Sequence, residues 1–380
     1  MASLRTWLAA LAALLPAAVV AADLPAGAIA RIGDYRFYHG PGFQCAVLSP
    51  DGRRAASAAG PLPFTHHVTD RDREEYGRTL ILWDTATGDR LREMKVGEGP
   101  VRHLAFSPDG RVLAAVCSQG VTLFDPETGR LIRRFGDDFD DRARFTPDGK
   151  ELLGGGFLKH TVSAWDVASG KRVRNWKSPA GPNEWVKDLE AVRHSEPSPD
   201  GRLIAWLLYN APDYRRLPRG AHPSFPFTFP AHALVVTDAA SGRPLYRREF
   251  GETALLAFTF SPDGRRFLTG GDKLQVWDAT TGRELAALDC PGVFRAAVTQ
   301  DGRRAVVAAY NARVRVWDLE TGKPGPGLNA GLAGGSEPIL EASPSISADG
   351  ATVLLATDTT LRLFDLVTGQ EPPGPAHRTP

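Results

Sequence analysis

The 380-residue chain carries 45 Lys and Arg against 44 Asp and Glu, and 42% of its residues are hydrophobic. This balance disfavours a nucleic-acid partner, because proteins that bind nucleic acid usually carry a basic excess. Cys45, Cys117 and Cys290 are an odd number, too few for a disulfide framework, and form no Cys-x-x-Cys pair. We therefore expect no disulfide-stabilised fold, no cysteine metal site and no cofactor.

Residues 1–22 have the pattern of a secretory signal peptide. Arg5 supplies the positive start, Trp7 to Val20 is apolar, and Val20-Ala21-Ala22 offers small residues for cleavage before Asp23. The alternative is a retained membrane anchor, but the apolar run is shorter than the roughly 20 residues of a membrane span and contains Pro16. We expect an extracytoplasmic protein, periplasmic or secreted, with no membrane span after cleavage.

Two short motifs alternate along residues 23–370. The first is a turn of Ser-Pro-Asp-Gly type, whose residues suit successive positions of a type I turn. The second is aromatic-Asp-x-x-Thr/Ser-Gly, where Asp can accept backbone N–H bonds and Gly can take a positive φ. The glycines of the first motif are Gly52, Gly110, Gly149, Gly201, Gly264, Gly302 and Gly350, and the aspartates of the second are Asp84, Asp125, Asp166, Asp238, Asp278, Asp318 and Asp365.

Seven copies, most of them about forty residues long, indicate a propeller or a repeat array. A continuous apolar run, such as Val112 to Val116, follows the first motif and is typical of a strand buried on both sides. The last strand of a copy alternates with charge, as in Leu131 to Phe135. The pattern predicts an all-β, seven-bladed β-propeller in which burial falls from the first strands of a blade to the half-exposed fourth strand.

The two motifs together resemble those of the WD-repeat propeller family, over roughly Arg31 to Gly369. The chain lacks the Gly-His pair that often opens a repeat, and Thr237 stands where other copies have an aromatic residue. The family's structural hydrogen-bond tetrad is therefore not carried over to this chain. The resemblance implies a non-catalytic scaffold for protein interactions.

The register of the repeat predicts how the ring closes. In later copies, the residue 14 positions before the turn glycine ends an outer strand, as Val96 does before Gly110. Tyr38 lies at the same distance before Gly52, yet no blade precedes it. We therefore expect residues 35–38 to form the outer strand of the seventh blade, which would protect a sheet edge. Residues 371–380 contain a Pro-rich stretch that cannot continue a hydrogen-bonded ladder, and are expected to be a flexible tail.

Insertions occur at one end of the blades, where the second strand joins the third and where one blade joins the next. They are Pro61 to Thr79, Lys177 to Glu190, Ala211 to Ala233 and the Gly-rich Pro324 to Pro338. Long loops on one face of a rigid scaffold are where binding residues concentrate.

The two insertions that flank the fourth blade form the candidate partner-binding site. They are rich in Arg and aromatic residues, which are enriched in interface hot spots. The alternative is that the aromatic residues only pack their own loop onto the propeller. The candidate residues are Trp185, Asn183, Tyr214, Arg215, Arg216, Arg219, Phe225 and Phe227.

Other chemistry is less well supported. His66, His67, Asp70 and Asp72 could suggest a metal site, but adjacent histidines point apart in an extended chain, and we expect no metal. The acidic residues within 137–141 lack the ligand spacing of a calcium loop. No nucleophile elbow, phosphate loop or His-Glu-x-x-His motif is present.

We therefore predict an exported, monomeric propeller that binds an unidentified protein or peptide and is not an enzyme. The alternative is a propeller enzyme or small-ligand binder that uses the axial channel. Converging His and carboxylate side chains at the channel would favour this alternative.

Overall fold

The computed structural model describes residues 43–59, 78–97, 99–117, 120–136, 142–155, 161–179, 190–210, 233–250, 255, 257–309, 313–328, 344–356 and 361–371. All of them belong to one compact unit, residues 37–380. The expected signal peptide, the strand at 35–38 and the tail after Glu371 lie outside the described residues. Within the described ranges there is no helix, and hence none long and apolar enough to cross a bilayer.

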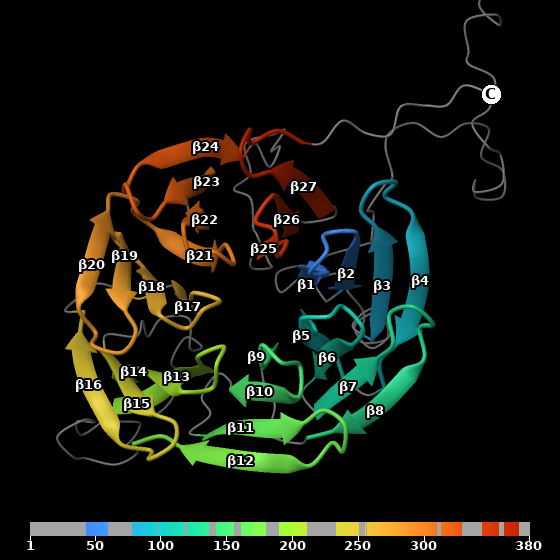
Figure 1. The fold of residues 1–380 in the computed structure, drawn as a ribbon, viewed down its shortest axis with the longest axis horizontal. Helices are drawn as coiled ribbons and strands as arrows, with labels where there is room; N and C mark the ends of the chain where they lie inside the picture. The colour runs from blue at the N-terminus through green and yellow to red at the C-terminus, as the bar shows by residue number, and fades with distance from the viewer. Residues whose placement is uncertain are drawn as a thin grey trace, which may run out of the picture. The chain divides into compact units, whose positions relative to one another are not determined.

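Seven antiparallel sheets surround a common axis, which confirms the predicted seven-bladed β-propeller (Figure 1). We number the sheets blades 1 to 7 in chain order. The strands of blades 1 to 4 are β1 (Phe43–Leu48), β2 (Arg54–Ala59), β3 (Thr79–Asp84), β4 (Arg90–Lys95); β5 (Val101–Phe106), β6 (Leu113–Cys117), β7 (Gly120–Phe124), β8 (Leu131–Phe135); β9 (Arg142–Phe145), β10 (Glu151–Gly155), β11 (Thr161–Asp166), β12 (Arg172–Lys177); β13 (Glu190–Pro197), β14 (Leu203–Asn210), β15 (Ala233–Asp238) and β16 (Pro244–Glu249).

Blades 5 and 6 also have four strands each, and blade 7 has three within the described residues. Their strands are β17 (Ala257–Phe260), β18 (Arg266–Gly270), β19 (Leu274–Asp278), β20 (Glu284–Leu288); β21 (Val293–Val298), β22 (Arg304–Ala309), β23 (Arg313–Asp318), β24 (Pro324–Leu328); β25 (Ser345–Ile346), β26 (Thr352–Ala356) and β27 (Leu361–Asp365). The first strand of each blade is innermost in Figure 1, and the fourth follows the outer rim.

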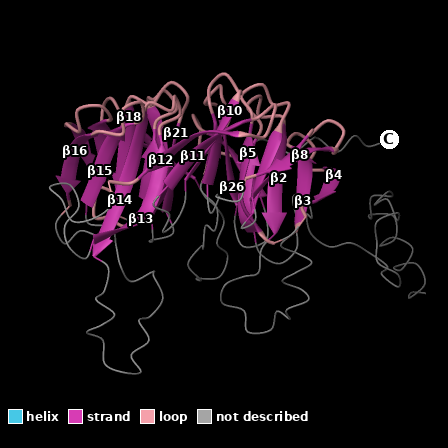
Figure 2. Ribbon diagram, turned by 90° about the horizontal axis from the view of Figure 1, so that it is seen from below, coloured by secondary structure: helices cyan, strands magenta, loops and turns pink. Residues whose placement is uncertain are grey.

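Both predicted turns form as expected from their side chains. In the first, Ser49 Oγ donates to Asp51 Oδ1 over 2.6 Å, and Gly52 has a φ of 69°. In the second, Asp278 Oδ1 accepts the Thr281 N–H over 2.7 Å. The Ser49 hydroxyl lowers the pKa of Asp51, and the Thr281 N–H lowers the pKa of Asp278. These carboxylates are therefore ionised acceptors at neutral pH. The described turns lie along the upper edge in Figure 2.

The core consists of seven apolar clusters, each of which joins two neighbouring blades. The cluster between blades 7 and 1 includes Leu354 and Leu363 on one side and Leu48 and Trp83 on the other. The Leu48 N–H also donates to Ser345 Oγ over 2.9 Å. The last blade therefore contacts the first through residues of its own, whichever strand completes blade 7.

Two details differ from the predicted pattern. Burial is greatest in the second and third strands, as in β6 and β7, whereas the innermost strand β5 is only partly buried. The reason is that the innermost strands line a central cavity. The expected link from Pro324 to Pro338 begins with strand β24, because prolines are tolerated on an edge strand that needs fewer N–H donors.

A hydrogen bond between a tryptophan and a hydroxyl group explains why blade 4 has Thr237 where other copies have an aromatic residue. In blade 5 the Trp277 indole N–H on the third strand donates to Thr269 on the second over 2.9 Å. In blade 4 the arrangement is reversed, since Trp206 on the second strand donates to Thr237 on the third over 3.0 Å. The indole–hydroxyl pair is thus kept while its two members exchange strands.

Candidate functional site

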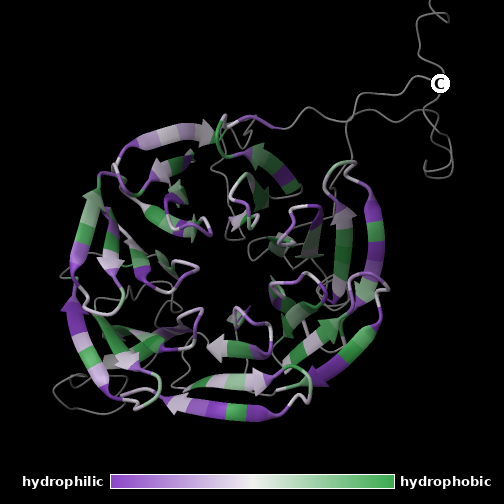
Figure 3. Cartoon of the chain, in the orientation of Figure 1, coloured by the Kyte–Doolittle hydropathy of each residue, from purple (hydrophilic) through white to green (hydrophobic). Residues whose placement is uncertain are grey.

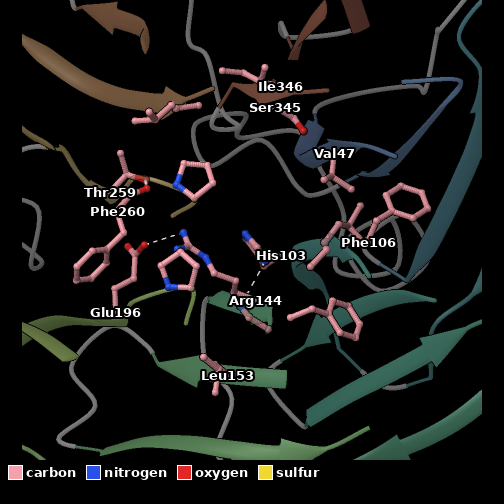
Figure 4. A pocket seen from close by; sticks show the side chains of 18 of the residues that line it. Val47, His103, Phe106, Arg144, Leu153, Glu196, Thr259, Phe260, Ser345 and Ile346 are labelled. Atoms are coloured by element: carbon pink, nitrogen blue, oxygen red, sulfur yellow. Dashed lines mark hydrogen bonds and ion pairs between the residues drawn. The ribbon is translucent and has the colours of Figure 1, made fainter. Parts of the chain in front are cut away.

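An open cavity of about 630 Å³ lies on the propeller axis and is lined by residues from all seven blades (Figure 4). The repeat sets its lining, because equivalent positions of the innermost strands face the axis together. Five residues before each turn glycine the chain places Val47, Ala105, Arg144, Glu196, Thr259, Ala297 and Ser345, and all seven line the cavity.

A second ring of residues lies two positions before the same glycines. Five of its seven members are prolines, and the other two are Gln300 and Ala348. These residues belong to the turns between the first and second strands. The cavity wall at the turn end is therefore mainly apolar and conformationally restricted, because a proline ring fixes the backbone φ.

Among the residues five positions before the turn glycines, the two charged ones lie in adjacent blades 3 and 4. Arg144 Nη2 on β9 donates to Glu196 Oε1 on β13 over 2.9 Å. The Glu196 side chain is 5% exposed and that of Arg144 is 33% exposed. Burying a carboxyl group is costly unless it has a hydrogen-bonding or cationic partner, and Arg144 is such a partner for Glu196. The pair presents a donor and an acceptor in an otherwise mostly apolar wall.

His103 extends this polar sector to blade 2. Its Nδ1 accepts the Ala143 N–H over 3.4 Å, next to Arg144 (Figure 4). Three neighbouring blades therefore contribute an imidazole, a guanidinium and a carboxylate to one side of the cavity. This arrangement can bind a ligand that carries both donor and acceptor groups.

Within the described ranges, no group of three or more His, Cys, Asp or Glu side chains is placed to hold a metal ion. Cys45 and Cys117 are buried free thiols. Burial raises the pKa of both thiols, that of Cys117 to about 11. They pack in the apolar cluster between blades 1 and 2, as small core residues.

The binding residues predicted from the sequence are not among the residues that line this cavity in the described part of the chain. Asn183, Trp185, Tyr214, Arg215, Arg216, Arg219, Phe225 and Phe227 all lie outside the described residues, as do His66, His67, Asp70, Asp72 and the acidic residues of 137–141. The sequence reasoning did not identify Arg144 and Glu196. Aligning the copies on their turn glycines would have revealed them, because this position is charged only in copies 3 and 4.

The comparisons with known proteins agree with this repeat. The model of the family described as "WD domain, G-beta repeat" matches residues 88–125, one full period from the last strand of blade 1 through the third strand of blade 2. The chain is a WD-repeat β-propeller. The model of the family described as "Outer membrane protein assembly factor BamB" matches residues 231–371 of this WD-repeat propeller.

A curated relative of the WD-repeat propeller is WD repeat-containing protein 18 of Bos taurus, which is 26% identical over 110 residues. The matched segment is 28% of this chain and 25% of the bovine protein, so the similarity spans about a quarter of that relative's length.

Proposed function

We propose that this WD-repeat propeller is an exported, non-catalytic scaffold that binds a protein or peptide through the face that carries its insertions. The family supports a role in protein interactions. The observation that carries the proposal is the strand register of blade 4. Glu190 pairs with Asn210, and Leu208 pairs with Ala233, so the described ends of both flanking insertions adjoin one another.

Blade 4 also differs from the other blades in length. Strands β13 and β14 have eight residues each, whereas the other strands of the propeller have six or fewer among the described residues. In Figure 2, β13 reaches further down than its neighbours, on the side away from the described turns. The longer sheet supports a rigid base for the two insertions, and rigid presentation lowers the entropy lost on binding.

Deleting residues 211–232 and bridging Asn210 to Ala233 with a short Gly-Ser segment is expected to abolish partner binding with little loss of stability. Ala233 is fully buried in β15 and must be kept. Loop closure depends only weakly on loop length, so the fold should tolerate the change. Partners recovered by pull-down from the extracytoplasmic fraction would be titrated against the variant, and thermal unfolding would be followed in parallel.

A finer variant and its control accompany the deletion. Replacing Trp185, Arg215 and Arg216 by Ala should each weaken binding by about 2 kcal/mol, the usual effect at a hot spot. Arg71→Ala with Arg73→Ala, in the insertion of blade 1, is the matched control and should have no effect. If the deletion of residues 211–232 lowers the melting temperature instead, the aromatic residues of that insertion stabilise the propeller, and the proposal fails.

Ligand binding in the axial cavity is a second candidate function, supported by the Arg144–Glu196 pair. The same experiment separates the two. Glu196→Gln keeps the side-chain volume and removes the negative charge. Binding that survives the loop deletion but is lost in Glu196→Gln would assign the function to the cavity and contradict the scaffold proposal.

Export rests on residues 1–22 and is supported by the family matched at residues 231–371, whose description names an outer membrane protein assembly factor. We expect the native protein to begin at Asp23. N-terminal sequencing of protein from the producing cell would test this. A chain that starts at Met1 and fractionates with the cytoplasm would contradict the proposed compartment.

A further inference from the structure

The outer strands of blades 2 and 3 carry an unusual concentration of positive charge. Residues 129–136 and 170–178, which contain β8 and β12, hold seven of the 45 basic residues of the chain and none of its 44 acidic residues. Six of the seven are exposed, and Arg133 is half-buried. The basic residues are Arg130, Arg133, Arg134, Lys171, Arg172, Arg174 and Lys177.

Aliphatic side chains lie among these charges. Leu131, Ile132 and Val173 are 47%, 46% and 49% exposed. In Figure 3 hydrophilic and hydrophobic residues follow one another along this part of the rim, at the strands labelled β8 and β12 in Figure 1. We call these three residues and the seven basic ones the basic rim surface.

The two strands form one continuous surface. Arg133 Nη1 on β8 donates to the carbonyl oxygen of Ser169, in the turn that leads into β12, over 3.1 Å. The guanidinium of Arg172 lies 5.5 Å from the centre of the Trp165 ring, and that of Arg174 lies 5.1 Å from the centre of the Trp176 ring. These contacts hold part of the positive charge in place before any partner arrives.

Within the part of the chain that the structure describes, the acidic groups nearby leave most of these basic residues without an ion pair. Glu151 pairs with Arg174, and Glu127 pairs with Arg54 of blade 1. The carboxylate of Asp166 accepts the N–H and hydroxyl of Ser169 within its own turn. Among the salt bridges of the described residues, none involves the exposed side chains of Arg130, Arg134, Lys171 or Lys177.

Protection of sheet edges does not explain the surface. Lys and Arg on edge strands prevent edge-to-edge pairing, and every outer strand of the ring needs such protection. The outer strand β20 nevertheless begins with Glu284, with Arg283 just before the strand and Asp289 just after it. Exposed aliphatic residues also work against protection, because they favour association.

We propose that the basic rim surface docks the propeller on an anionic lipid surface. Basic side chains interleaved with aliphatic ones are typical of proteins that lie in a membrane interface, where the charges meet acidic headgroups and the aliphatic groups enter the acyl boundary. A flat surface that touches the outside of a ring contacts only adjacent blades, and blades 2 and 3 are adjacent. The opposite charge of the lipid complements the seven basic residues.

Co-sedimentation of the purified full chain with vesicles tests this proposal. We expect binding to phosphatidylcholine vesicles that contain phosphatidylglycerol, little binding to phosphatidylcholine alone, and loss of binding at high salt because screening weakens surface charges. Arg130→Glu, Lys171→Glu and Lys177→Glu together should reduce the affinity at least a hundredfold, since each basic residue near an anionic surface contributes roughly fivefold. None of the three side chains makes a hydrogen bond or ion pair among those described.

Two matched controls accompany this triple variant. Lys273→Glu, Arg283→Glu and Lys323→Glu change the net charge equally on blades 5 and 6 and should leave binding within about twofold. Leu131→Asn, Ile132→Asn and Val173→Asn should weaken vesicle binding at least tenfold, whereas Leu285→Asn on β20 should not. Leu285 is 41% exposed and lacks the surrounding basic residues.

Three outcomes would overturn the proposal. Unchanged binding of the Arg130, Lys171 and Lys177 variant would move the contact elsewhere, and an equal loss in the control triple variant would make it an effect of net charge. A chain that ignores the anionic vesicles but binds a polyglutamate peptide through the same residues would assign the surface to an acidic protein instead. Unfolding curves that match the unsubstituted chain would show that each variant is folded.

Discussion

Replacing Trp83 by Ala is expected to lower the free energy of unfolding by about 3–5 kcal/mol, the range for truncating a buried aromatic side chain. Trp83 is 1% exposed and packs in the cluster that joins blades 1 and 7. Its indole N–H also donates to Ser57 Oγ over 2.8 Å. Both interactions lie beside the joint between the last blade and the first, so the loss should weaken closure of the ring.

Denaturant unfolding would measure this effect, with two further variants as controls. Trp83→Phe keeps most of the apolar volume and leaves the Ser57 hydroxyl without its donor, so a smaller loss of about 1–2 kcal/mol is expected. Trp206→Ala removes a fully buried tryptophan with the same type of hydrogen bond from blade 4. It should destabilise the fold to a similar extent, but aggregation should be greater for Trp83→Ala, because an opened ring exposes sheet edges. Equal losses in Trp83→Phe and Trp83→Ala would contradict a packing role.

Replacing Gly155 by Val is expected to push blades 3 and 4 apart and to cost about 3 kcal/mol or more, the upper end for overpacking a core. A Cβ atom at Gly155 would lie 2.4 Å from the carbonyl oxygen of Ser195. That oxygen belongs to the backbone of β13, so it cannot rotate away as a side chain would. Ser195 also precedes Glu196, so the substitution should disturb the Arg144–Glu196 ion pair as well.

The control for this substitution is Gly327→Val. Nothing lies within 4 Å of a Cβ atom at Gly327, which is on the outer strand β24. The melting temperature should fall strongly for Gly155→Val and stay nearly unchanged for Gly327→Val. Similar melting temperatures for the two variants would mean that β13 moves to accept the side chain, and the close approach of the two blades would then contribute little to stability.

The local parts of this fold follow from short stretches of sequence. The carboxylate of Asp278 bonds to groups two and three residues further along the chain, and Ser49 bonds to Asp51. Interactions over so few residues depend little on the rest of the protein, so seven copies of each motif predict seven blades. The exposed fourth strand was predicted correctly, but the partial exposure of the innermost strand was not, because hydropathy does not reveal that this strand borders a cavity.

The candidate sites depend on longer distances along the chain. Arg144 and Glu196 are 52 residues apart in sequence and meet because blades 3 and 4 are neighbours at the same register. The basic residues of β8 and β12 likewise become one surface only when their blades stand side by side. The insertion residues around blade 4 were selected by composition alone, and their role stays a prediction.

The sequence by itself therefore determined the number of blades, the chemistry of their turns and the family, because each depends on residues a few positions apart in a repeated unit. The tertiary structure alone decided which residues meet across the joints between blades. Ring closure brings equivalent positions of successive copies to one axis and one rim. Within the described residues, it is this juxtaposition that creates the axial cavity with its single Arg144–Glu196 pair and the basic rim surface on blades 2 and 3.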